Sequence, residues 1–238
     1  MTAWELLKAN RCEEAIPLFT AELAERPSTG VHNNRGTAYL LLGDFARALA
    51  DFEAAERVSE QTSGSPGDGA KCGVAHWMAG EYQQAATVWE RGAQAMLEGR
   101  IVHTDAAGGV SIANLLWFAA TRLQDAARRA LATKVLRKRL RTKQSQAWPG
   151  PVSRFLLGQI GEAEMRAAIT STPILREREL CTAEFFVGVA ALESNVPFYH
   201  ESMQRAVEMG SVSKIEVEYY LALHEVGRGK RTDAASPA

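Results

Sequence analysis

Asn33-Asn34-Arg35-Gly36-Thr37-Ala38-Tyr39 and Leu42-Gly43-Asp44-Phe45, followed by Ala48, Phe52 and Ala55, form the stretch that decides the fold. The chain copies this spacing further on, since Gly73 and Ala85 lie as far apart as Gly36 and Ala48. Equivalent residues recur downstream at Gly73, Gly80, Tyr82, Ala85 and Trp89, and upstream at Asn10, Ala15, Phe19 and Pro27. A repeat of this kind predicts helical hairpins that stack on copies of themselves.

The spacing resembles that of the tetratricopeptide repeat (TPR), a pair of helices of about 34 residues. In this resemblance Gly36 lies where the two helices approach too closely for a larger side chain, and Ala48 lies at their crossing. Gly43 ends the first helix in left-handed backbone, and Phe52 fills the space beside Ala48. We therefore expect an all-α, TPR-like right-handed solenoid of about six helical hairpins, with helix pairs near 10–26, 30–60 and 67–98.

Composition agrees with a helical globular protein. The 238 residues are 46% hydrophobic and 23% charged, and their net charge of -1 gives no overall attraction to nucleic acid or to a membrane surface. Cys12, Cys72 and Cys181 are odd in number and far apart, which predicts buried thiols in a reducing, cytoplasmic compartment. The N-terminus has no long apolar run, so we expect no signal peptide.

We divide the chain into three regions. Residues 1–98 are expected to hold TPR units 1–3, with Trp4 covering the open end of the stack. Residues 99–228 are expected to form divergent hairpins continuous with the first part, beginning with a buried helix in the uncharged run between Asp105 and Arg122. Residues 229–238 are expected to be a disordered tail.

A second resemblance comes from the C-terminal half. Trp148-Pro149-Gly150-Pro151, Phe185-Phe186-Val187-Gly188 and Ala206-Val207-Glu208-Met209-Gly210, together with the TPR units, look like bacterial TPR proteins. Among these the chain is similar to the envelope lipoprotein family that serves as an adaptor for a protease and cell-wall enzymes. It departs from that family because it lacks the lipid-anchoring cysteine. The resemblance implies a concave groove, lined by the first helix of each unit, that binds peptides or partner domains.

Carried to this sequence, the groove positions fall on the first helices of the second and third units. Asn34 and Lys71 also match two positions of a clamp that holds a peptide's C-terminal carboxylate in some TPR domains. The first repeat offers Trp4 and Lys8 at the nearest equivalents, so the clamp is half present. For Trp77 and Met78, packing between repeats stays open as an alternative. The predicted partner-binding residues are Asn33, Asn34, Thr37, Leu41, Lys71, Val74, Trp77 and Met78.

A basic helix is predicted over 128–143, where no acidic residue occurs between Asp125 and Glu162. Its densest part holds Arg137, Lys138, Arg139 and Arg141. Two interpretations remain open: a contact surface for an acidic protein, RNA or anionic lipid, or a solvated outer helix whose cations favour its C-terminal end. Aromatic residues do not alternate with these charges, as they would in a platform for single-stranded nucleic acid. We expect nucleic-acid binding to be weak.

Patterns typical of an enzyme are missing. The five histidines are scattered without metal-ligand spacing, and carboxylates such as Glu13, Glu14, Asp51 and Glu53 are expected on the exposed sides of helices. We therefore expect no catalysis, no metal and no cofactor. The remaining functions are a protein-protein adaptor that binds a protein or peptide in its groove, an immunity-type inhibitor of one toxin or enzyme, and nucleic-acid binding through the basic helix. A membrane is not an expected partner, and a homodimer stays open.

Overall fold

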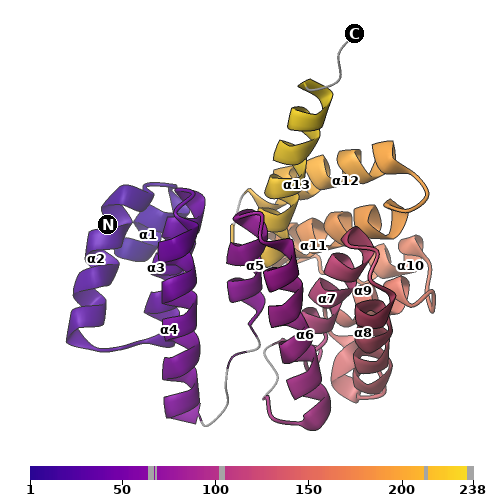
Figure 1. The fold of residues 1–238 in the computed structure, drawn as a ribbon, viewed down its shortest axis with the longest axis horizontal. Helices are drawn as coiled ribbons and strands as arrows, with labels where there is room; N and C mark the ends of the chain where they lie inside the picture. Colours follow the sequence, from indigo (N-terminus) through magenta and orange to yellow (C-terminus); the bar gives the residue numbers. More distant parts are fainter. Residues whose placement is uncertain (64–66, 68, 102–104, 212–213, 235–238) are drawn as a thin grey trace. The chain divides into compact units, whose positions relative to one another are not determined.

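The computed structural model describes residues 1–63, 67, 69–101, 105–211 and 214–234 (Figure 1). The described residues form helices and connecting turns, without a strand. This confirms the predicted all-α, TPR-like helical-repeat fold. The chain divides into a first compact unit, Met1–Val102, and a second, His103–Ala238.

The first unit consists of three helix pairs. In each pair the earlier helix packs against the later one, and α2 and α4 also pack against the helices that follow them. The opening helix of the first pair has only six residues, as expected for a hairpin that lacks most of its first helix. The pairs are α1 (Ala3–Lys8) with α2 (Cys12–Glu25), α3 (Thr29–Leu41) with α4 (Phe45–Ser63), and α5 (Ala70–Met78) with α6 (Tyr82–Glu98).

One turn geometry joins the helices within each pair. Its central residue has positive φ, with Asn10 at 61°, Gly43 at 77° and Gly80 at 85°. In each case the amide of this residue donates to the carbonyl three residues back, and the next amide donates to the carbonyl five residues earlier. These bonds satisfy carbonyls that would otherwise be left unpaired at the helix end. The turn therefore sets a common register for counting along α1, α3 and α5.

Close helix crossings follow the same register. A Cβ on Gly36 would lie 2.7 Å from the Phe52 ring, and one on Gly73 would lie 2.1 Å from Nε1 of Trp89. Ala48 and Ala85 are both 0% exposed. The glycine positions of the second and third pairs therefore leave no room for a side chain beside Phe52 and Trp89.

Replacing Ala85 with leucine is expected to lower the melting temperature clearly. The methyl group of Ala85 has no exposed surface, and overpacking of a filled core typically costs about 1–3 kcal/mol. Ala50→Leu on the exposed side of α4 is the matched control, and it should melt close to wild type. Equal melting of the two variants would show that Ala85 does not lie at a tight crossing.

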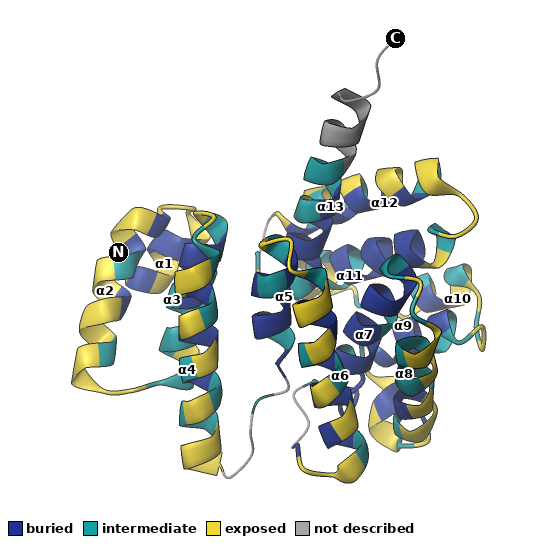
Figure 2. Ribbon diagram, viewed as in Figure 1, coloured by how far each residue is buried: buried dark blue, intermediate teal, exposed yellow. Residues whose placement is uncertain are grey.

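The second unit consists of α7 to α13. In Figure 2, α7 is buried along most of its length, which agrees with the buried helix expected in the uncharged run. Among the pairs, α7 packs on α8, α9 on α10, and α11 on α12, while α13 packs on α12 and α11. The helices are α7 (Ser111–Arg122), α8 (Ala126–Arg139), α9 (Gly150–Leu156), α10 (Glu162–Ala167), α11 (Pro173–Ala191), α12 (Val196–Gly210) and α13 (Val217–Ala234), with a short 3-10 helix at Lys143–Gln146.

The C-terminal boundary differs from the prediction. Helix α13 extends to Ala234, so residues 229–234 belong to a helix and not to a disordered tail. Residues 235–238 lie outside the described part of the chain.

Buried carboxylates hold the helices of the second unit together. Glu225 on α13 is 1% exposed. It accepts a hydrogen bond from the Tyr199 hydroxyl at 2.8 Å and forms an ion pair with Arg122 of α7 at 3.0 Å. Glu184 on α11 accepts from Arg166 of α10 at 2.6 Å and from Arg205 of α12 at 2.9 Å. Burial raises the pKa of Glu184, but its two arginine partners outweigh this and lower it overall. Glu184 is therefore an anion held between two cations.

Candidate partner-binding face of the first unit

The residues predicted on α3 are partly exposed. Asn33, Asn34, Thr37 and Leu41 each keep part of their surface in solvent. The side-chain amides of Asn33 and Asn34 make no hydrogen bond with the residues that the structure describes, whereas the Thr37 hydroxyl donates to the Asn33 carbonyl at 2.8 Å. Leu41 packs against the apolar core of α1 to α3. This face of α3 therefore offers two unpaired amides beside an apolar edge.

Two of the four α5 residues predicted to bind a partner are buried. Lys71 and Met78 are partly exposed, and the Lys71 ammonium lies 5.7 Å from the centre of the Phe52 ring. Val74 and Trp77 are each 1% exposed. Placing these two side chains on a binding groove is therefore wrong, because they leave almost no surface for a partner.

Trp77 is a core residue of the α5–α6 pair. Its ring stacks on Trp89 with centroids 5.8 Å apart, and it meets Tyr82 at 4.8 Å. Aromatic pairs at such distances add to the stabilisation that burial alone provides. Of the two interpretations left open for Trp77, packing is the one that fits.

Trp4 and Lys8 of α1 occupy the same register positions as Thr37 and Leu41 of α3, whereas Trp4 was expected to cover the end of the stack. Trp4 precedes its turn residue, Asn10, by six positions, as Thr37 precedes Gly43. Lys8 is equivalent to Leu41 in the same way. Trp4 is 36% exposed, and the Lys8 ammonium lies 5.8 Å from the centre of its ring. Asn10 and Ala15 precede Gly43 and Ala48 by the same number of residues, and the positive φ of Asn10 agrees with this register.

A buried ion pair fixes the orientation of α3. Asp51 on α4 is 4% exposed, which corrects its expected position on an exposed side. It accepts hydrogen bonds from Arg35 Nε at 2.8 Å and Nη2 at 2.7 Å, and its Oδ1 lies 3.0 Å from His32 Nδ1. The bond to Asp51 raises the pKa of Arg35, and Arg35 also donates to Thr20 of α2 at 2.9 Å. This network ties α3 to α2 and α4, and it leaves the neighbouring Asn33 and Asn34 outside.

The basic stretch does not form one uniform surface. Arg128 pairs with Asp125 at 3.3 Å, and Arg129 pairs with Glu193, in the turn after α11, at 2.8 Å. Arg139 turns inward and donates to the Gly108 carbonyl at 2.6 Å. Arg137, Lys138 and Arg141 remain exposed. The helix itself ends at Arg139, before the predicted limit of residue 143.

Among the described residues, no helix is long and apolar enough to span a membrane, and no three or more His, Cys, Asp or Glu side chains are grouped so that they could hold a metal ion. The three cysteines are buried and carry free thiols, as predicted for their burial.

Comparison with known proteins supports the assignment of the N-terminal hairpins. No curated protein matches the chain. The family model of the tetratricopeptide repeat matches residues 1–66, which contain α1 to α4 and the face described above. Residues 1–66 are therefore similar to tetratricopeptide repeats.

Proposed function

We propose that this protein is a non-catalytic adaptor that binds a segment of a partner protein along the first helices of its N-terminal repeats. Tetratricopeptide repeats generally mediate protein-protein interactions. The observation that carries the proposal is the pair of partly exposed, unpaired amides of Asn33 and Asn34, on a helix that Asp51 holds in place. A side-chain amide both donates and accepts, so it can pair with an extended peptide backbone.

The neighbouring residues give the face a chemical character. Trp4 supplies exposed aromatic surface, of the kind that anchors many interfaces. Lys8 lies beside its ring, and Lys71 adds a second cation at the position equivalent to Asn34. The segment that fits is an extended one, with an apolar side chain for Trp4 and an acidic group for Lys8. The buried free thiols favour a reducing compartment for this encounter, such as the cytoplasm.

Affinity capture with matched variants tests the proposal. A variant with Trp4→Ala, Asn33→Ala and Asn34→Ala should lose proteins that the wild-type chain retains, by about tenfold or more, because the anchor and both amides are removed. The three side chains are exposed or partly exposed, so helix content should be kept in a circular dichroism spectrum.

The control changes three exposed residues on another face. Ala46, Ala50 and Glu53 are exposed on α4, and Ala46→Ser, Ala50→Ser and Glu53→Ala together should leave capture unchanged. Equal capture by both variants and the wild type would show that the α1–α3 face does not bind the captured proteins.

A further inference from the structure

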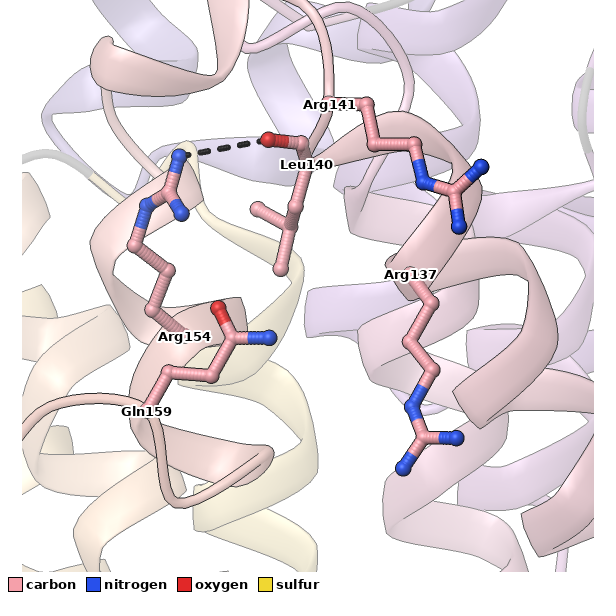
Figure 3. A pocket seen from close by; sticks show the side chains of 5 residues that line it. All are labelled: Arg137, Leu140, Arg141, Arg154 and Gln159. Carbon is pink, nitrogen blue, oxygen red and sulfur yellow. Dashed lines mark hydrogen bonds between the residues drawn. The ribbon is translucent and has the colours of Figure 1, made fainter.

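The end of α8 and the turn after α9 enclose a pocket of about 360 Å³ in the second unit. It is lined by Arg137, Leu140, Arg141, Arg154 and Gln159 (Figure 3). In this view Arg137 and Arg141 lie on one side of Leu140, and Arg154 and Gln159 lie on the other. We propose that this pocket binds the phosphoryl group of a small phosphomonoester.

Charge is the first argument. Three of the five lining residues are arginines and none is acidic. Arg137 lies near the end of α8 and Arg141 in the turn just after it; like charges this close in sequence repel each other, and neither arginine makes an ion pair with the described residues. A ligand with two negative charges would relieve this repulsion, and arginine keeps its charge at any ordinary pH.

Preorganisation is the second argument. The Nη2 atom of Arg154 donates to the Leu140 carbonyl at 3.3 Å and to the Ser145 hydroxyl at 2.9 Å. Ser145 is 0% exposed, so it holds this guanidinium firmly. Nε and Nη1 of Arg154 make no hydrogen bond with the described part of the chain. They remain as donors for phosphoryl oxygens, at a reduced entropic cost of ordering the side chain.

Gln159 completes the site. Gln159 follows Gly158, which has a φ of 66° and forms the same kind of turn as in the first unit. The backbone amide of Gln159 donates to the Arg154 carbonyl at 2.9 Å. The side-chain amide of Gln159 lines the same pocket and adds a neutral donor and acceptor. Because small-molecule pockets hold about 300–1,000 Å³, the volume leaves room for an organic group next to Leu140. A phosphomonoester therefore fits better than phosphate alone.

The pocket is separate from the proposed partner-binding face, since all its residues belong to the second unit. Its cations come from α8, the turn after α8, and α9, and they include Arg137 and Arg141 of the four residues predicted as the basic surface. Ligand binding in this pocket can therefore be tested independently of the adaptor function.

Isothermal titration of the full chain with glycerol phosphate, and separately with inorganic phosphate, tests the proposal at low and constant ionic strength. Arg137→Gln with Arg141→Gln should weaken binding of glycerol phosphate at least about tenfold, since two charge-assisted contacts are lost. Lys134→Gln removes a cation from an exposed position of the same helix, and it should change the affinity less than about twofold. Tighter binding of the ester than of inorganic phosphate would identify the ester as the ligand.

Protonation of the ligand gives a second readout. Lowering the pH from about 7.5 to about 5 crosses the second pKa of a phosphate ester, about 6, and should weaken binding severalfold. The side-chain amide resonance of Gln159 should shift on titration in the wild type and not in the double variant. The proposal is wrong if neither ligand binds, or if the double variant binds as well as Lys134→Gln.

Discussion

Replacing Trp77 with alanine is expected to lower the free energy of unfolding by about 3–5 kcal/mol, the usual cost of deleting a large aromatic side chain from a core. The Trp77 ring is 1% exposed and lies against both Trp89 and Tyr82. Its removal leaves a cavity that the Trp89 and Tyr82 rings can fill only by shifting from their present positions. Denaturant unfolding of the full chain, followed by circular dichroism, measures the effect.

Trp4 is the matched comparison for Trp77, because it has the same side chain in an exposed position of the same unit. Trp4→Ala should change stability by no more than about 0.5 kcal/mol, as for most surface substitutions, while it weakens partner binding. The reverse pattern, with stable Trp77→Ala and lost binding, would make Trp77 the groove anchor after all.

Replacing Glu218 with glutamine is expected to stabilise the protein at alkaline pH. Glu218 on α13 is 6% exposed. Burial, followed by the charge of Glu216, raises its pKa from 4.5 to about 8, although Arg178 of α11 opposes this shift. Arg178 itself donates to Glu216. The thiol of Cys181, also on α11, has its pKa raised by burial and then by Glu218 and Glu216.

The sign of the pH effect follows from the raised pKa. The folded state binds a proton on Glu218 that the unfolded state releases, so stability falls as pH rises from about 4.5 towards 8. A shift of this size corresponds to a free energy on the order of 4 kcal/mol. Glu218→Gln should remove most of this loss, whereas Glu164→Gln, at an exposed position of α10, should retain it. Parallel pH profiles for Glu218→Gln and wild type would contradict the prediction.

The sequence predicted the fold of the first unit because its turns and crossings use residues with few alternatives. Glycine at 36, 43, 73 and 80 marks positions where a side chain or a negative φ does not fit. The same turn occurs at Gln124, between α7 and α8, with φ of 54°. This turn could not be predicted from the sequence, because glutamine, unlike glycine, does not indicate left-handed backbone.

The close crossing of α7 and α8 was hidden for a similar reason. Trp117 and Arg129 occupy the register positions that Gly36 and Ala48 hold in the second hairpin. The Arg129 guanidinium lies 4.6 Å from the centre of the Trp117 ring. A cation stacked on an aromatic face replaces the glycine–alanine contact, so spacing by residue type could not reveal the repeat.

The binding face was predicted less completely than the fold. The α3 residues follow from their place in the repeat, and the structure leaves them partly exposed. Val74 precedes Gly80 as the partly exposed Thr37 precedes Gly43, but Val74 is 1% exposed. Trp77 is equivalent to Leu40, which is also buried. Sequence spacing gives the side of a helix on which a residue lies, whereas exposure depends on what the next helix places opposite it.

Site-specific photo-crosslinking tests the central claim, that a partner segment lies along α3. A photoreactive amino acid replaces Thr37 in one variant and Ala50, exposed on α4, in another. Each is irradiated in complex with a partner captured by the wild-type chain. The account predicts a covalent adduct from position 37 and none from position 50. An adduct from position 50 alone, or from neither position while the complex is intact, would contradict it.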